Sequence, residues 1–206
     1  MPLQNRVDPW GRLIAVSARG AWLGNRGILH NERKEIISPW KHKSWVTCEL
    51  QFKGRKRDIF SQGTYSELFF LDEATALSAG HRPCAECRRA RYNEFKAIWL
   101  KVNPQMESSS VDQIDKQLHK ERAVRGGAKM KHCLKFEDLP EGAFIEIEGE
   151  AWLFWMGALK KWSPSGYVSK ILPPPGEEVV VLLTPPSIVE LMKNGFTPQV
   201  HASAIS

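Results

Sequence analysis

Apolar residues recur with two different spacings in the first half of the chain. Across residues 45–52 every second residue from Val46 onward is apolar, which predicts a half-buried strand. Across residues 85–102 the apolar positions follow helical spacing instead, with Tyr92, Phe95 and Trp99 on one stripe. We therefore expect a strand and a long amphipathic helix, separated by a shorter apolar segment.

That shorter segment, residues 68–71, predicts a second strand. Asp72 follows it and can accept hydrogen bonds from the free amides of a new helix over residues 73–79. Gly80 can adopt the left-handed conformation that ends such a helix, and Pro83 then restricts the backbone. The pattern predicts a strand, a short helix, a tight turn and a second helix in succession.

The last third of the chain is predicted to be mainly β-structure. Residues 144–148 and 151–156 form two apolar runs around Gly149-Glu150, which is typical of a hairpin. Residues 179–183 predict a buried strand, and a final helix is expected over residues 188–193.

The composition favours an ordinary intracellular domain. Of the 206 residues 42% are apolar and eight are Trp, so the chain can bury a core without disulfides. Four cysteines are too few for a disulfide framework, and residues 1–12 contain no apolar signal region. We expect a reduced, cytoplasmic protein with no membrane partner, because no apolar run has the length needed to span a bilayer.

The net charge of +6 is distributed unevenly. Residues 136–206 hold nine acidic and four basic side chains, a net charge of −5, so residues 1–135 hold 14 acidic and 25 basic side chains, a net charge of +11. Such an imbalance favours a polyanionic partner, although a basic half can also be a merely solvated surface.

The tight turn contains two cysteines, in Cys84-Ala85-Glu86-Cys87. This spacing brings two sulfurs to one point and supplies half of a tetrahedral zinc site. The same spacing also serves redox chemistry or arises in buried thiols, but here a short helix and Arg-Pro precede it, which favours zinc. Cys48 and Cys133 are the expected remaining ligands, with His81 and His132 as alternatives. A buried, non-ligand role remains open for Cys48.

With zinc included, the sequence predicts an α+β fold. A zinc-stabilised basic half, residues 1–135, packs on a small β-rich half, residues 136–206, as two regions or as one compact domain.

Residues 65–89 resemble the second half of the zinc-binding domain of the Ada DNA-repair protein, most closely over Ala79-Gly80-His81-Arg82-Pro83-Cys84-Ala85-Glu86-Cys87. That family binds zinc through four cysteines on DNA, where a zinc thiolate takes a methyl group from a backbone phosphotriester. The resemblance assigns Cys84 and Cys87 to the second ligand pair. The first pair has no counterpart, because residues 58–64 contain no cysteine. The whole chain also resembles a group of bacterial proteins, which implies no function.

Arginines and lysines cluster where a nucleic acid could be bound. The predicted phosphate contacts are Arg26 in a glycine-rich segment, Arg55, Lys56 and Arg57 in a basic turn, and Arg82, Arg88, Arg89 and Arg91 around the cysteine turn. The alternatives are a plain glycine-rich turn and charged, solvated surfaces. Candidate groups for proton transfer are His30, His119 and Glu121, although no known catalytic spacing is present.

Three functional hypotheses follow from these patterns. The leading one is a zinc-containing nucleic-acid-binding protein, for DNA rather than RNA, that acts in DNA repair or processing. The second is a nucleic-acid-processing enzyme, such as a nuclease, a base-removing enzyme or an alkyl-transfer protein. The third is a structural zinc module that binds another protein.

Overall fold

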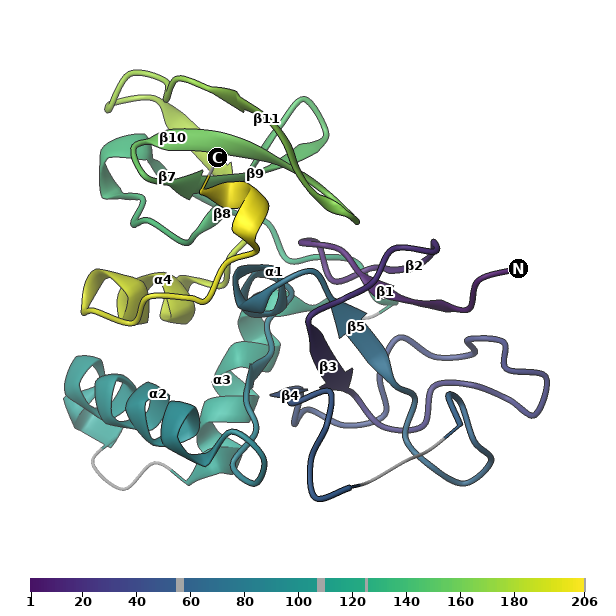
Figure 1. The fold of residues 1–206 in the computed structure, drawn as a ribbon. Coiled ribbons are helices and arrows are strands. Elements are labelled where there is room, and N and C mark those ends of the chain that lie inside the picture. Colours follow the sequence, from purple (N-terminus) through teal and green to yellow (C-terminus); the bar gives the residue numbers. More distant parts are fainter. Residues whose placement is uncertain (55–57, 107–109, 125, 206) are drawn as a thin grey trace.

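A computed structural model describes residues 1–54, 58–106, 110–124 and 126–205. Within these residues, two six-stranded sheets and four α-helices confirm the predicted α+β fold. Figure 1 shows the first sheet, which includes β1 to β5, on one side of α1 and the second sheet, which includes β7 to β11, on another. Helices α2, α3 and α4 lie together beside both sheets (Figure 1).

The first sheet has the strand order β2-β1-β5-β3-β4-β6. Its strands are β1 (Gln4–Val7), β2 (Leu13–Ala15), β3 (Trp22–Asn25), β4 (Val46–Cys48), β5 (Leu68–Phe70) and β6 (Arg82–Pro83). Strand β4 is antiparallel to β3 and parallel to β6. Pro83 has no backbone N–H to donate to a neighbouring strand, and it is tolerated in β6 because this strand lies at the edge of the sheet.

The second sheet has the order β11-β10-β9-β8-β12-β7, and its strand pairs are antiparallel. Its strands are β7 (His132–Lys135), β8 (Phe144–Ile147), β9 (Glu150–Trp155), β10 (Ala158–Ser163), β11 (Gly166–Ile171) and β12 (Val179–Leu182). The β8–β9 hairpin turns at Glu148 and Gly149, both with positive φ (50° and 77°), as a two-residue turn requires. Strand β7 joins this sheet although it belongs to the predicted basic half.

The helices bring the two sheets together around a shared core. They are α1 (Glu73–Ser78), α2 (Arg89–Val102), α3 (Val111–Arg122) and α4 (Pro186–Lys193), with short 3-10 turns η1 (Pro104–Met106), η2 (Phe136–Asp138) and η3 (Ala202–Ala204). The largest buried cluster combines Leu77 of α1, Phe95 and Trp99 of α2, Leu118 of α3 and Ile145 of β8. Burial of this cluster therefore holds the predicted halves against each other.

Two predicted elements differ in length from those observed. The strand predicted over residues 45–52 is only β4, and the helix predicted from Ala85 begins at Arg89. The buried residues of the first segment are Trp45 and Thr47, whereas Cys48 is only partly buried. The alternating apolar residues, Val46 and Cys48 among them, instead line a cavity. None of the helices in the described residues has the length and apolar character that crossing a membrane requires.

The start and the end of α1 follow the predicted signals. Asp72 accepts a hydrogen bond from the Thr75 amide at 2.8 Å, and Gly80 has a φ of 88°. This short helix is completely buried, so it fixes the direction in which the chain enters the cysteine turn.

Candidate metal centre

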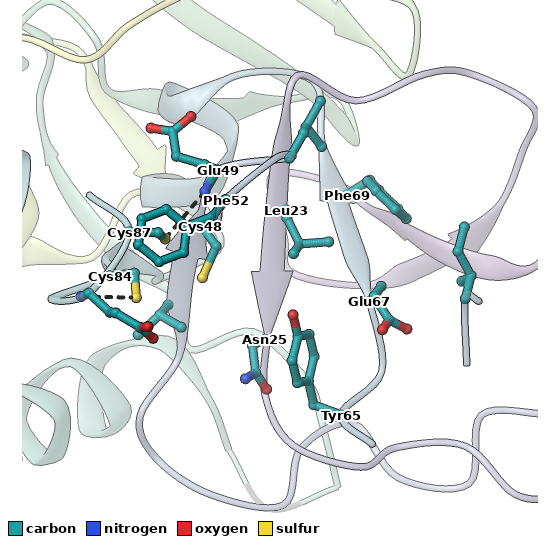
Figure 2. Close-up of a pocket in the computed structure, with 14 residues that line it drawn as sticks. Leu23, Asn25, Cys48, Glu49, Phe52, Tyr65, Glu67, Phe69, Cys84 and Cys87 are labelled. Atoms are coloured by element: carbon teal, nitrogen blue, oxygen red, sulfur yellow. Dashed lines mark hydrogen bonds between the residues drawn. The ribbon is translucent and has the colours of Figure 1, made fainter. Parts of the chain in front are cut away.

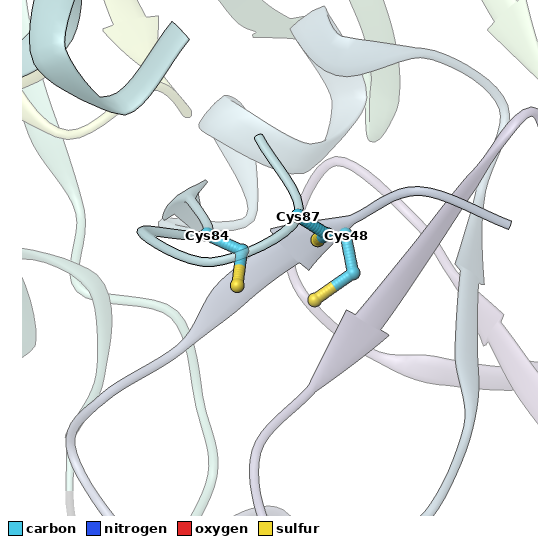
Figure 3. Close-up of side chains that lie close together, drawn as sticks. All are labelled: Cys48, Cys84 and Cys87. Atoms are coloured by element: carbon cyan, nitrogen blue, oxygen red, sulfur yellow. The ribbon is translucent and has the colours of Figure 1, made fainter. Parts of the chain in front are cut away.

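Three cysteines meet at one point in the first sheet. The Sγ atoms of Cys48, Cys84 and Cys87 all lie within 4.8 Å of one another (Figure 3). Four zinc–sulfur bonds of about 2.3 Å in a tetrahedron separate sulfurs by about 3.8 Å, so these thiols need to shift by only about 1 Å to share one ion. The three cysteines can therefore hold a metal ion.

Parallel pairing of β4 and β6 produces this meeting. Thr47 lies opposite Pro83, and the Cys84 amide donates to the Thr47 carbonyl at 2.9 Å. Because the strands run in the same direction, the next residue of each, Cys48 and Cys84, emerges at the same edge. The turn after β6 then brings Cys87 back to the same place (Figure 3).

Backbone amides point at the sulfurs. The Glu86 amide donates to Cys84 Sγ, and the Glu49 amide donates to Cys87 Sγ, both at 3.4 Å. Such bonds favour thiolates, which are the form that binds a metal.

The three thiols share their protons unequally. A hydrogen bond from Cys48 is the main cause that lowers the pKa of Cys84 to about 5, and amides of Cys87 and Glu86 act in the same direction. The same bond to Cys84, followed by burial, raises the pKa of Cys48, and burial raises the pKa of Cys87. These shifts favour a thiolate on Cys84, and binding of a metal cation would release the protons that the cluster still holds.

A cavity of about 390 Å³ adjoins the cysteines (Figure 2). Its apolar wall consists of Leu23, Val46, Leu50, Phe52, Ile59 and Phe69. Its polar wall consists of Asn25, Glu49, Tyr65, Glu67 and Glu86. Cavities of this size, mostly apolar with a few polar groups, are typical of small-molecule sites.

The other predicted metal ligands lie elsewhere. Cys133 is exposed on β7, opposite Val181 of the second sheet, and His132 next to it contacts the Glu121 carbonyl at 2.8 Å. His81 is fully buried, and its Nε2 accepts a hydrogen bond from Arg26 Nε at 3.1 Å. In the described part of the chain, no fourth His, Cys, Asp or Glu joins the three-cysteine cluster.

Four of the five predicted phosphate contacts that the structure describes have internal partners. Arg26 is 1% exposed and stacks on the Trp45 ring at 3.9 Å, and burial lowers its pKa to about 9. Arg82 pairs with Asp115 at 2.8 Å inside the protein. The sequence missed these roles because a buried arginine and a solvated one have the same spacing pattern.

Buried Glu73 of α1 forms ion pairs with two further arginines from the predicted phosphate contacts. Its carboxylate lies 2.8 Å from Arg88 and 2.8 Å from Arg91. Among the predicted phosphate contacts that the structure describes, Arg89 alone has an exposed side chain. Arg55, Lys56 and Arg57 lie outside the described residues.

The predicted proton-transfer groups are not brought together. His30 Nδ1 lies 2.6 Å from Ser66 Oγ and its ring stacks on Phe60. His119 packs edge-on against two tryptophan rings, and burial lowers its pKa. The Glu121 carboxylate accepts from the Ser187 amide at 2.9 Å, where α4 begins. These contacts give each of the three residues a structural role.

Comparisons with models of protein families, with curated proteins and with solved structures gave no match for this chain. The fold and the site define a mixed α+β protein with a three-cysteine cluster that can hold a metal ion.

Proposed function

We propose that the chain is a zinc-containing nucleic-acid-binding protein whose zinc centre is accessible to a bound group. The observation that carries this proposal is the three-cysteine cluster in the wall of a cavity of about 390 Å³. Cys48, Cys84 and Cys87 would hold the ion.

The donor set favours zinc. Thiolates are soft ligands that select zinc, copper(I) or iron–sulfur clusters over magnesium or calcium. Two of the cysteines share a Cys-x-x-Cys turn with amide-to-sulfur hydrogen bonds, which is the arrangement of many zinc sites.

The number of ligands supports a reactive site. Structural zinc sites have four protein ligands, whereas catalytic sites have three and leave one position for water or substrate. Zinc at this cluster would supply a Lewis acid or a bound water of lowered pKa. This favours the nucleic-acid-processing alternative over a purely structural zinc module.

Charge supports a nucleic-acid partner. Residues 1–135 carry a net charge of +11, and Arg89 and Lys53 remain exposed near the cysteine turn and the cavity-lining Phe52. Such cations bind phosphates without reading sequence, while aromatic residues such as Phe52 and Phe69 can stack on an unpaired base. The resemblance to the Ada domain favours DNA over RNA.

The zinc assignment is tested by metal content and thiol reactivity. We expect about one zinc per chain, three protected thiols and a single reactive thiol on Cys133, because zinc-bound thiolates are shielded. Cys48→Ser should lose at least about tenfold in zinc affinity, whereas Cys133→Ser, a matched control, should bind zinc like the parent. Equal zinc affinity in both variants would remove Cys48 from the site.

The nucleic-acid assignment is tested by salt dependence. Binding of a fluorescent single-stranded DNA should weaken steeply between 50 and 200 mM salt, and Arg89→Gln should reduce the slope of log K against log salt by about one phosphate contact. Arg82→Gln should leave that slope unchanged in the folded fraction, since Arg82 is paired internally. Absence of binding at 50 mM salt would contradict the proposal.

A further inference from the structure

Glu67 is a buried carboxylate in the wall of the same cavity. It is 6% exposed, its Oε2 accepts a hydrogen bond from the Phe60 amide at 2.8 Å, and its Oε1 has no partner among the described residues. Figure 2 shows it on the side of the cavity away from Cys84 and Cys87.

The strand order of the first sheet sets the distance between Glu67 and the cysteines. Cys48 ends β4, Glu67 immediately precedes β5, and β3 lies between these strands. Cys48 and Phe69 both pair with Leu23 of β3, so Glu67 is also offset from Cys48 by two residues along the strand direction. Two strand spacings of about 4.8 Å and two residues of about 3.3 Å place the backbones of Glu67 and Cys48 roughly 12 Å apart. A molecule in the cavity can therefore contact both.

An unpartnered carboxylate oxygen needs an explanation. Leaving a buried charged acceptor unsatisfied costs more than leaving a neutral one, so such an atom is retained where a ligand or water completes it. The hydrogen bond from the Phe60 amide accounts for only one oxygen of Glu67. Phe60 itself has its backbone in the left-handed region, at a φ of 58°. Strained backbone of this kind clusters at binding sites.

We propose that Glu67 selects the occupant of this cavity by accepting a hydrogen bond from an exocyclic amine of a nucleobase. Adenine and cytosine offer an amine at the position where hypoxanthine and uracil offer a carbonyl oxygen. A carboxylate attracts the amine and repels the oxygen, while aromatic residues of the wall accept either ring. This inference rests on the proposed function, because it assumes that the cavity admits an unpaired base.

Glu67→Gln separates recognition from structure. The side-chain oxygen of the glutamine can keep the bond to the Phe60 amide, and the NH2 group of its side-chain amide then takes the place of Oε1. That NH2 group donates a hydrogen bond, so the variant favours a carbonyl oxygen on the base where Glu67 favours an exocyclic amine. A variant with the same shape thus inverts the chemistry of one atom.

The experiment measures the affinity of length-matched single strands, oligo(dC) against oligo(dU) and oligo(dA) against oligo(dI). Charge is equal within each pair, so the phosphate contribution cancels. The parent should prefer dC and dA by about tenfold, since a hydrogen bond to a charged group contributes that order of selectivity. Glu67→Gln should abolish or reverse both preferences and should unfold at a temperature no lower than the parent. Glu137→Gln, which removes an exposed carboxylate in another part of the chain, is the charge control and should keep them.

The outcomes separate the two proposals. Equal preferences in the parent and Glu67→Gln would overturn the role of Glu67 and leave it as the partner of Phe60 only, while nucleic-acid binding itself would stand. Failure of every strand to bind would overturn the proposed function and this inference with it. Retention of the dC and dA preferences in Cys48→Ser would show that base selection by Glu67 survives loss of the metal and would support the assignment.

Discussion

Replacing Asp115 by asparagine tests whether Arg82 is a structural residue or a phosphate contact. Arg82 of β6 directly precedes the cysteine turn, and its Nε and Nη2 donate to the two oxygens of Asp115 on α3, each at 2.8 Å. Both side chains are 4% exposed. Arg82 Nη2 also donates to Ser44 Oγ at 3.0 Å, which leaves little of the guanidinium for an outside anion.

The expected cost follows from burial. An asparagine keeps the shape of Asp115 but leaves the Arg82 charge without its counter-ion in a site closed to water. Breaking a buried ion pair from one side costs about 3–5 kcal/mol, because the remaining charge is desolvated and unpaired. This is a large share of the roughly 5–15 kcal/mol by which a domain is stable.

Urea unfolding followed by tryptophan fluorescence measures this cost, since the chain contains eight Trp. Asp138→Asn provides the control: that side chain is exposed, and a surface change should stay within about 0.5 kcal/mol. A loss below about 1 kcal/mol for Asp115→Asn would refute the reasoning, because the pair would then behave like an exposed ion pair. Arg82 would again be a candidate for phosphate binding.

Three further substitutions test other parts of the structure by the same unfolding assay. Burial lowers the pKa of His81 well below 6.5, and the charges of Arg26 and neighbouring cations act in the same direction. Below pH 6.5 the unfolded chain therefore binds one proton more than the folded chain, and the free energy of unfolding falls by about 1.4 kcal/mol per pH unit. His81→Gln keeps an acceptor for Arg26 and should flatten this slope by about one proton; an unchanged slope would contradict the assignment. Tyr167→Phe removes a 2.7 Å hydrogen bond to the buried Asp72 carboxylate and should cost about 1.5–3 kcal/mol, whereas a neutral effect would show that water replaces it. Gly24→Ala should cost about 1–3 kcal/mol, because its Cβ would lie 2.4 Å from an aromatic carbon on β5, and an unaffected midpoint would show that the sheet can yield there.

Local sequence signals predicted the local structure well. The Asp72 cap, the glycine stop at Gly80 and the apolar stripe on α2 each act within a few residues of the chain, so each can be recognised without a fold. The same is true of the Cys84 and Cys87 turn, because the two cysteines are three residues apart. The α+β class follows from these signals together with the strand-rich last third.

The third cysteine depended on tertiary structure. Cys48 and Cys133 were equally eligible by residue type, and only the parallel pairing of β4 with β6 brings Cys48 to the turn while the second sheet takes Cys133 away. Parallel strands meet through a long connection, so no short-range pattern encodes their register.

Only the fold decided which charged side chains form ion pairs inside the protein. By itself the sequence determined that the first 135 residues are strongly basic, that a short helix leads into a two-cysteine turn and that α and β elements are mixed. The tertiary structure placed Glu73 against Arg88 and Arg91, and Asp115 against Arg82, which turns predicted phosphate contacts into internal ion pairs. The physical reason is that a charged group is paired by whatever lies beside it in space, and sequence spacing reports such neighbours only within one helix or hairpin.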